Sequence, residues 1–512
     1  MTSFWINVLL FVSTSSSSWA TTIEYPTAVR IKDNFNLTLH AKYPQITYGW
    51  LTFKGILWKN NIYVDKTMLI RKLLTDDHQG HKIVLITGPR KFCKTINLYM
   101  MKEFLKHEVD WDAIRIPINE TYGYKLFRNL SYETSWVHNT WELIKHPLLV
   151  TEDTQFVDQH QGQYPTIFIT FDNITGDNFI EIYNYMLYEM HHAFREHIYI
   201  INHLSYLLRD EKNQTKFEEI YNTFTYYLAI ENEGGAEDEI ASAFLFLSEL
   251  LYKYYNKKMY IFVSDYDYIL RKVLFEITTI PYNDKERILN WFETFYEFTL
   301  VGNPYVEKVF LTGVFSFPTR RMRLLIRDVY EYDFYRDLSQ YYGFTEQEVD
   351  SFCQHFNIGE KLKNELRLRY NGYKGGENYT RNVYNPWSMI RFLNQADRKV
   401  KPFWPKETKI EIVARFARNE KVNETLQSLI RGETVFLRRE RLHFTRQDFE
   451  NLKYKIIYKH EFVDDDIQII LGYLYRTGYL TPCENVDNSD VQVAVRMPNR
   501  ETKNGLEGRL QG

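Results

Sequence analysis

One feature restricts the possible fold of this sequence more than any other. It is a short apolar run that ends at a glycine–proline pair and is followed by a helical pattern. Residues 83–87 (IVLIT) are apolar and β-prone, Gly88 and Pro89 interrupt them, and a helical pattern begins at Thr95. This succession predicts a buried strand, a tight loop and a helix. Strand, loop and helix together form the context that a phosphate-binding loop requires.

The loop itself, residues 88–95 (GPRKFCKT), matches a P-loop except that Cys93 stands where the second glycine belongs. In an intact loop, backbone N–H groups surround the phosphates, a lysine reaches the β- and γ-phosphates, and a hydroxyl group holds Mg²⁺. Lys94 and Thr95 retain those capacities. A Cβ atom at position 93 narrows the approach to phosphate and restricts the backbone angles. The alternative interpretation of Lys94 is an ordinary lysine at a helix start.

Three further apolar runs, 166–170, 259–263 and 309–312, alternate with helical patterns such as 176–208 and 236–256. This alternation predicts an α/β fold, a three-layer P-loop NTPase-like domain with a largely parallel sheet between helices. We expect a lead-in segment at 21–54, the P-loop domain at 55–315, a helical domain at 316–450 and a small C-terminal α+β unit at 451–512. Thr345 and Glu348 have the spacing of a helix capping box.

The balance of charges argues against a dedicated nucleic-acid binder. Lysine plus arginine number 63 against 66 aspartate plus glutamate, which leaves no basic excess to attract a phosphate backbone. The three cysteines, Cys93, Cys353 and Cys483, are too few and too widely spaced for a disulfide framework. Whether Cys93 is free or paired with one of the others stays open at this stage.

The first twenty residues have the pattern of an export signal. An apolar stretch at 4–12 leads through a serine-rich run to Ala20, and we expect cleavage after this residue. No lysine or arginine precedes the apolar stretch, so a buried N-terminal helix is the alternative. No later stretch reaches the length of about 18 apolar residues that a membrane span needs. The sequence therefore predicts a secreted protein without a membrane anchor after cleavage.

Acceptor motifs for N-glycosylation agree with a secretory route, although an Asn-rich chain also produces some by chance. They lie at Asn36, Asn119, Asn129, Asn173, Asn213, Asn378 and Asn423.

An ordered series of short motifs resembles the AAA-ATPase-like family. The segments YVDKT (63–67), YNGY (370–373) and YNPWS (384–388) match its signatures, and GPRKFCKT is similar to its phosphate-binding loop. Further matches in the same order are YPT (164–166), GFTE (343–346), GYLT (478–481) and PNRE (498–501). The resemblance covers residues from about 55 to 502 and implies a P-loop fold that binds ATP with Mg²⁺.

The resemblance also implies roles for individual residues around a nucleotide. Asp65 and Lys66 would lie near it, and Thr312 would follow the strand whose end senses the γ-phosphate. Capping of a helix start by Asp65 and Lys66 and a simple turn at Thr312 are the alternatives. The cofactor-binding set is Gly88, Arg90, Lys94, Thr95, Asp65, Lys66 and Thr312.

A second departure from the family lies at residues 263–267 (VSDYD), which are similar to its Walker B strand end. Ser264 replaces the aspartate that supports Mg²⁺, and Asp265 replaces the glutamate that polarises water. We assign Asp265 as the catalytic candidate and, with Thr95, as a Mg²⁺ ligand. If Asp265 holds the metal, Tyr266 stands where the base belongs.

These departures predict weak or lost ATP hydrolysis. The alternative function is a secreted non-enzymatic effector or interaction protein that keeps the fold as a scaffold for an unknown protein partner.

Two weaker patterns have simpler interpretations. Arg320 and Arg321 could act as a charge-stabilising finger, but a solvated basic helix face is favoured. Asp490, Glu501 and Lys503 imitate a nuclease metal site. Few residues follow Lys503 to complete such a fold, and we expect these charged residues to belong to a frayed terminus.

Overall fold

The computed structural model describes residues 28–30, 37–40, 53, 62–110, 112–128, 133–137, 140–144, 147–172, 174–201, 203, 214–233, 237–275, 279–317, 319–325, 327–395, 397–408, 410–484 and 491–511. A five-stranded parallel sheet forms its centre, with strand order β10–β4–β9–β8–β7. Its strands are β4 (Ile83–Thr87), β7 (Thr166–Thr170), β8 (Met259–Ser264), β9 (Val306–Gly313) and β10 (Val329–Tyr332).

Three strands of this sheet, β4, β7 and β8, are buried along their whole length because helices cover both faces of the sheet. Every residue of β4, β7 and β8 is buried, as expected for a parallel sheet enclosed between two layers. The predicted strands 83–87 and 166–170 agree with β4 and β7 at both ends. The predicted α/β class with a parallel sheet is therefore confirmed.

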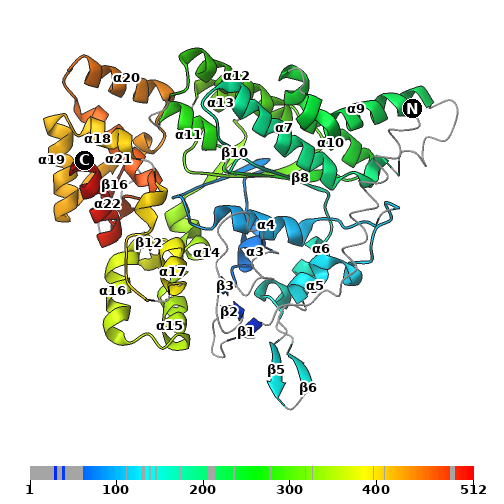
Figure 1. The fold of residues 1–512 in the computed structure, drawn as a ribbon, viewed down its shortest axis with the longest axis horizontal. Coiled ribbons are helices and arrows are strands. Elements are labelled where there is room, and N and C mark those ends of the chain that lie inside the picture. Colours follow the sequence, from blue (N-terminus) through cyan, green and yellow to red (C-terminus); the bar gives the residue numbers. More distant parts are fainter. Residues whose placement is uncertain are drawn as a thin grey trace.

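Helices lie on either side of the sheet, as Figure 1 shows. One layer contains α3 (Met68–Thr75), α4 (Lys94–Leu105), α5 (Tyr122–Arg128) and α6 (Thr154–His160). The other contains α7 (Phe179–Glu196), α9 (Gln214–Glu233), α10 (Glu237–Tyr255), α11 (Tyr268–Leu274), α12 (Tyr282–Tyr296) and α13 (Arg320–Leu325). Within the described ranges, no helix combines the length and apolarity needed to cross a membrane.

Two small antiparallel sheets accompany the helical layers. One has the order β1–β2–β3, and the other is the β5–β6 hairpin, which projects away from the body in Figure 1. Their strands are β1 (Ala28–Arg30), β2 (Leu37–His40), β3 (Ile62–Val64), β5 (Glu133–Val137) and β6 (Thr140–Ile144).

The edge strand β10 comes from residues beyond 315, so the central sheet extends past the boundary that we placed there from the sequence. Its sequence, VYEY, is aromatic and acidic, and its first three residues are only partly buried. A lobe of short elements follows: α14 (Ser339–Tyr342), β11 (Phe344–Thr345), α15 (Glu346–His355), α16 (Glu360–Tyr370), β12 (Tyr373–Gly375), β13 (Arg381–Tyr384) and α17 (Pro386–Leu393). The capping box of Thr345 and Glu348 is confirmed at the start of α15.

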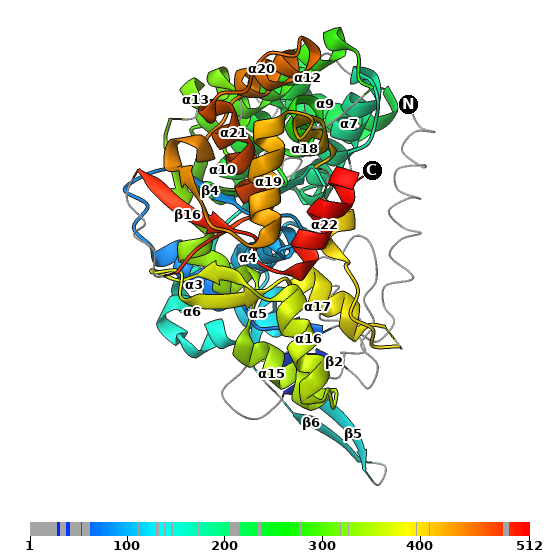
Figure 2. The ribbon, with the colours of Figure 1, turned by 90° about the vertical axis from the view of Figure 1, so that its left-hand side faces the viewer.

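The C-terminal residues pack against the sheet rather than forming a separate core. Leu85 of β4 and Leu474 belong to the same cluster of buried apolar side chains. The elements here are α18 (Glu411–Phe416), α19 (Glu420–Arg431), β14 (Val435–Arg438), α20 (Arg446–Ile457), α21 (Asp464–Thr477), β15 (Thr481–Pro482), β16 (Gln492–Arg496) and α22 (Arg500–Gln511). Figure 2 shows α19, α22 and β16 on the side that faces the viewer.

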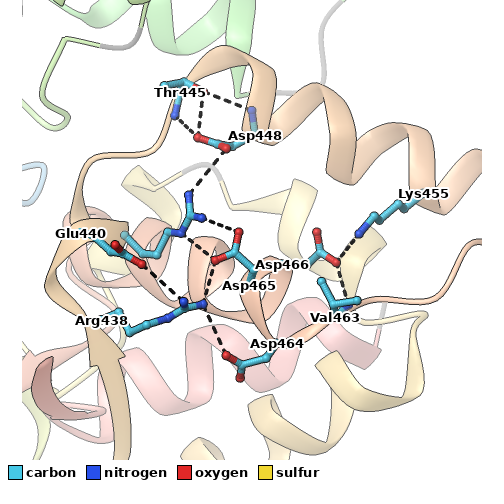
Figure 3. Close-up of polar contacts among 10 residues, drawn as sticks. Arg438, Glu440, Thr445, Asp448, Lys455, Val463, Asp464, Asp465 and Asp466 are labelled. Atoms are coloured by element: carbon cyan, nitrogen blue, oxygen red, sulfur yellow. Dashed lines mark hydrogen bonds and ion pairs between the residues drawn. The ribbon is translucent and has the colours of Figure 1, made fainter. Parts of the chain in front are cut away.

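Ion pairs fix the start of α21, as Figure 3 shows. The Asp465 carboxylate accepts hydrogen bonds from Arg441 Nε at 2.8 Å and from Arg438 Nη2 at 2.7 Å. Asp466 accepts from the backbone of Val463 at 2.7 Å and from Lys455 at 2.5 Å. Carboxylates at a helix N-terminus also interact favourably with the helix dipole. The start of α21 is thereby anchored, and its last turn lies at the edge of the central sheet.

Candidate functional site

The loop of residues 88–95 connects the carboxyl end of β4 to the first turn of α4. β4 lies inside the sheet, between β10 and β9. Ligands of open α/β sheets bind outside the carboxyl ends of the strands. The loop therefore occupies the position in which a phosphate-binding loop acts.

Aromatic packing sets the path of this loop. A Cβ atom on Gly88 would lie 2.5 Å from the ring of Phe334, so only glycine fits at this position. Phe92 is buried and packs edge-on against Phe334 and Tyr373, with ring centroids 5.9 and 4.9 Å apart. These contacts hold the loop from the side opposite to α4.

Lys94 lies at the first position of α4 and is 5% exposed. Its ammonium group donates hydrogen bonds to the carbonyl oxygens of Gly88, at 2.9 Å, and Pro89, at 2.6 Å. Burial lowers the pKa of Lys94 to about 8, and the negative charge of Asp265 opposes that shift. A buried cation with neutral partners gains strongly when an anion approaches, because its charge has lost most of its hydration.

The backbone around Lys94 offers further donors. The N–H groups of residues 93–96 make no hydrogen bond to any residue that the structure describes, and no side chain caps α4. Unpaired N–H groups and the positive end of the helix dipole together favour an anion at this point.

Cys93 keeps the backbone conformation that a glycine would adopt. Its φ angle is 54°, and that of Lys91 is 64°, both in the left-handed region. That conformation costs a residue with a Cβ atom about 1–2 kcal/mol. Burial raises the pKa of the Cys93 thiol to about 11, so the thiol is neutral, and none of the three cysteines forms a disulfide bond.

Three oxygen-bearing side chains meet beside Lys94. The Thr95 hydroxyl donates to Asp265 Oδ2 at 3.2 Å, and the Ser264 hydroxyl donates to Thr95 Oγ1 at 2.8 Å. One carboxylate and one hydroxyl beside a phosphate site are the donor set with which Mg²⁺ is held together with nucleotide phosphates and water. Thr95 and Asp265 fit that role, while Ser264 adds no charge.

The two residues that follow Asp265 in the chain are not free to act as a base. Tyr266 is fully buried and donates its hydroxyl hydrogen to the carbonyl oxygen of Phe315 at 2.6 Å. Burial raises the pKa of Tyr266 well above its ordinary value. Asp267 is also buried and accepts hydrogen bonds from the N–H groups of Val314 and Phe315, both at 2.9 Å. Tyr266 and Asp267 therefore fix the turn after β9.

A family model with the description "Predicted AAA-ATPase" matches residues 47–114 and 129–322. The chain belongs to the AAA-ATPase-like family. The matched ranges include the loop after β4, the end of β8 and Thr312 at the end of β9. No curated protein matches the chain.

Other residues predicted from the sequence occupy different surroundings in this AAA-ATPase-like chain. The Thr312 hydroxyl is buried at the sheet edge and has no partner among the described residues. Arg90 is partly exposed, with its guanidinium 5.9 Å from the ring centroid of Tyr268. Thr312 and Arg90 thus differ from Asp65 and Lys66, whose side chains hydrogen-bond to other residues of the chain.

Asp65 accepts hydrogen bonds from the backbone and hydroxyl of Thr67, at 2.9 and 2.6 Å, and from Leu149 N at 2.8 Å. Lys66 donates to the Gln340 carbonyl at 2.7 Å and to Glu348 at 2.6 Å. These contacts are those of residues that start α3 and dock it.

Sequence reasoning missed a group of mostly partly buried polar residues at the end of β4. Arg476 Nη1 donates to Thr87 at 2.5 Å and to Glu331 at 2.8 Å, and Arg476 Nη2 donates to Ser316 at 3.2 Å. Ser316 also contacts His443 Nδ1 at 3.0 Å. We call Thr87, Ser316, Glu331, His443 and Arg476 the Arg476 cluster. It borders a cavity of about 240 Å³ that also touches Gly88 and Pro89.

The charges of this cluster compensate each other. Burial alone would raise the pKa of Glu331. The charges of Arg476 and His443 nevertheless hold this pKa below its ordinary value. Burial lowers the pKa of His443 to about 4. The only signal in the sequence was that Arg476 lies two residues before the GYLT signature at 478–481.

A second missed residue is Asp172, which follows the end of β7. Because β7 pairs with β8 through Thr170 and Ser264, this carboxylate comes to the same edge as Asp265. Burial and the charge of Asp265 raise the pKa of Asp172. The sequence signal was a carboxylate two residues after a predicted strand.

The weaker patterns of the sequence are accounted for by structural contacts. Arg321 pairs with Glu293 and Glu297, both at 3.5 Å, as on a basic helix face, and the side chain of Arg320 lies outside the described part. Glu501 is not in a frayed terminus as we expected: it is fully buried in the first turn of α22. It accepts hydrogen bonds from Ser388 and from the backbone of residues 403–404. Asp490 lies outside the described residues.

Proposed function

We propose that this chain binds a nucleoside triphosphate, ATP, with Mg²⁺ at the loop of residues 88–95. The observation that carries the proposal is a buried lysine beside unpaired N–H groups at the carboxyl end of an inner strand. Lys94 and the N–H groups of 93–96 would hold the phosphates, and Thr95 with Asp265 would hold the metal. The buried Thr312 hydroxyl would report the γ-phosphate at the end of β9.

Hydrolysis is weak or lost in this proposal. The bound nucleotide and Mg²⁺ would supply a polarised γ-phosphate, but the two residues that follow Asp265 in the chain are not free to act as a base. Tyr266 is locked by Phe315, and Asp267 is locked by two backbone N–H groups. Asp265 is the only catalytic candidate that the sequence offered, and metal binding would occupy it.

A titration with fluorescent ATP and Mg²⁺ tests binding. We expect a dissociation constant on the order of micromolar and no binding in Lys94→Ala. The matched control is Lys216→Ala, which changes an exposed lysine on α9. Affinity that is the same in Lys94→Ala and Lys216→Ala would overturn the proposal.

Restoring the altered motif residues tests the assignment of the defects. Cys93→Gly together with Ser264→Asp should tighten Mg²⁺–ATP and raise turnover, because the first change removes a Cβ atom that narrows the approach to phosphate and the second returns a carboxylate ligand for Mg²⁺. Unchanged affinity and turnover in the double variant would show that neither position limits the site.

One set of contacts favours the alternative of a non-enzymatic scaffold. The Trp404 indole donates to the carbonyl oxygen of Arg90 at 2.9 Å, and Gly478 approaches Pro89 so closely that a Cβ atom would lie 2.6 Å from it. The loop is thus packed against the C-terminal residues and its lysine is already hydrogen-bonded. A protein that shows no binding at millimolar nucleotide would support a secreted effector or interaction protein instead.

We also infer that the chain enters the secretory pathway and is glycosylated. Three acceptor asparagines lie in described segments, and all are exposed: Asn119, Asn378 and Asn423. The signal segment 1–20 and the acceptors Asn36, Asn129, Asn173 and Asn213 lie outside the described residues. N-terminal sequencing of exported protein should begin at residue 21, and a glycosidase should lower its apparent mass.

A further inference from the structure

A second cavity lies apart from the loop of residues 88–95 and shares no lining residue with it. Its volume is about 710 Å³, and it opens between α16, the β12–β13 hairpin and β16. That volume is in the range of pockets that hold small ligands, about 300–1,000 Å³. α16 and β16 lie on the side of the molecule that faces the viewer in Figure 2.

Signature motifs that the nucleotide site does not use build the frame of this cavity. Gly372 has a φ angle of 101°, and a Cβ atom on it would lie 2.0 Å from the Pro498 carbonyl oxygen. The Asn499 side chain donates to the Asn371 carbonyl oxygen at 2.8 Å. The YNGY and PNRE segments therefore cross in direct backbone contact, which leaves room for no side chain at position 372.

The GFTE segment joins the same frame. Glu346 accepts hydrogen bonds from Asn371 at 2.9 Å and from Tyr384 at 3.1 Å, and it forms an ion pair with Arg367. Glu346 is the only carboxylate among the lining residues of the described part. Its charge is thus neutralised within the wall.

Four cations from four different elements line the cavity: Arg367, Lys374, Arg381 and Arg496. Arg367 is paired with Glu346, and Lys374 forms an ion pair with Glu484 at 2.8 Å. Arg381 contacts the neutral side-chain oxygen of Gln340. The Arg496 guanidinium has no hydrogen-bond or ion-pair partner within the described residues. Two guanidinium groups, those of Arg381 and Arg496, therefore carry charge that no described carboxylate balances.

We propose that this cavity is a binding site for a small ligand that carries two adjacent phosphate groups. Guanidinium groups bind phosphate oxygens in pairs of parallel hydrogen bonds, and an anion of high charge density matches two unbalanced arginines. Leu368 and Pro498 are the only apolar side chains in the described lining, so the walls suit a hydrated polyanion rather than an amphipathic carboxylate. Gln347 and Asn382 add exposed amides.

Inorganic pyrophosphate, without Mg²⁺, is the probe, and the Lys94→Ala variant is the background, because the loop of residues 88–95 also attracts phosphates. In isothermal titration we expect binding that Arg496→Gln weakens by about tenfold or more and Arg381→Gln by less, since Arg381 has a neutral partner already. Arg496→Lys should restore part of the affinity because it keeps the charge without the fork. Arg431→Gln, whose arginine pairs with Glu433 on α19, is the matched control.

A second arm uses ADP in the same background and distinguishes a nucleotide from a simple diphosphate. Tighter binding of ADP than of pyrophosphate, with the same loss in Arg496→Gln, assigns the site to a nucleoside diphosphate. Equal or weaker binding of ADP assigns it to a diphosphate without a base. Binding that disappears in Lys94→Ala, or that Arg496→Gln leaves unchanged while both variants keep their unfolding transition, overturns the proposal. Loss of ATP binding at the loop would leave this result unaffected.

Discussion

The loop of residues 88–95 and the Arg476 cluster both lie at the end of β4, but they differ in whether their polar groups have hydrogen-bond partners. In the loop, the N–H groups of 93–96 have no described acceptor and Lys94 has only neutral partners. In the cluster, Glu331 and Arg476 neutralise each other, and Ser316 and Thr87 complete their hydrogen bonds. Polar groups left unsatisfied at a sheet edge indicate a ligand site, whereas fully paired groups indicate a structural tie.

The largest effect that tests this comparison is expected from the cluster. Arg476→Met should lower the free energy of unfolding by about 3 kcal/mol, because it leaves the Glu331 carboxylate buried without its partner. Urea denaturation measures this loss. The double variant Arg476→Met, Glu331→Gln should recover part of it, and a single variant as stable as the parent would contradict the assignment as a tie.

The pH dependence of nucleotide affinity tests the loop. Burial depresses the pKa of Lys94 to about 8 in the free protein, and bound phosphate would raise it again. Binding then takes up a proton above pH 8, so affinity should be highest below that pH. It should fall by about tenfold between pH 7.5 and 9.5. Titrations across this range should show no fall in Lys94→Arg, whose guanidinium stays charged.

A smaller effect is expected at Cys93. Cys93→Gly should raise the free energy of unfolding by about 0.5–1 kcal/mol, since relief of the left-handed backbone outweighs the extra freedom of glycine in the unfolded chain. Cys93→Ala keeps the Cβ atom and should stay near the parent. Thermal unfolding of both variants provides the measurement, and a destabilised Cys93→Gly would speak against strain at this position.

The smallest change in stability is expected for Lys94 itself. Lys94→Met should alter the free energy of unfolding by only about 0.5 kcal/mol, because the apolar side chain removes the cost of burying an ammonium group while losing its two hydrogen bonds. Urea denaturation beside Arg476→Met gives the contrast directly. Equal losses in the two variants would mean that the lysine is a structural tie as well.

The inner part of the fold could be predicted because its signals are local. Residues 83–87 and 166–170 are apolar runs bounded by turn formers, and they became β4 and β7 with the same ends. The capping box at Thr345 lies within four consecutive residues and was equally readable. Local periodicity and capping need no knowledge of distant residues.

The rest depended on contacts between residues far apart in the chain. Glu331 and Arg476 are separated by 145 positions, and no sequence pattern near either residue predicts their contact. The contact of Glu501 is also long-range, because its partner Ser388 lies 113 positions away. From the sequence we therefore expected the Glu501 carboxylate to be solvated, although it is buried. At the candidate site, Asp172 was missed because the pairing of β7 with β8 brings it to the same sheet edge as Asp265.

The anchored helix α21 has a consequence for anyone who wishes to divide this protein. Its 14 residues extend over about 21 Å. They connect the ion pairs of Asp465 at the start of the helix to Arg476 in its last turn, which pairs with Glu331. A fragment that stops before residue 464 would lack this helix. The buried apolar side chains around Leu85 would then be exposed to water. We therefore expect the ATPase-like portion to be insoluble when expressed alone, and to need residues 464–512, covalently attached or added as a second polypeptide, to refold.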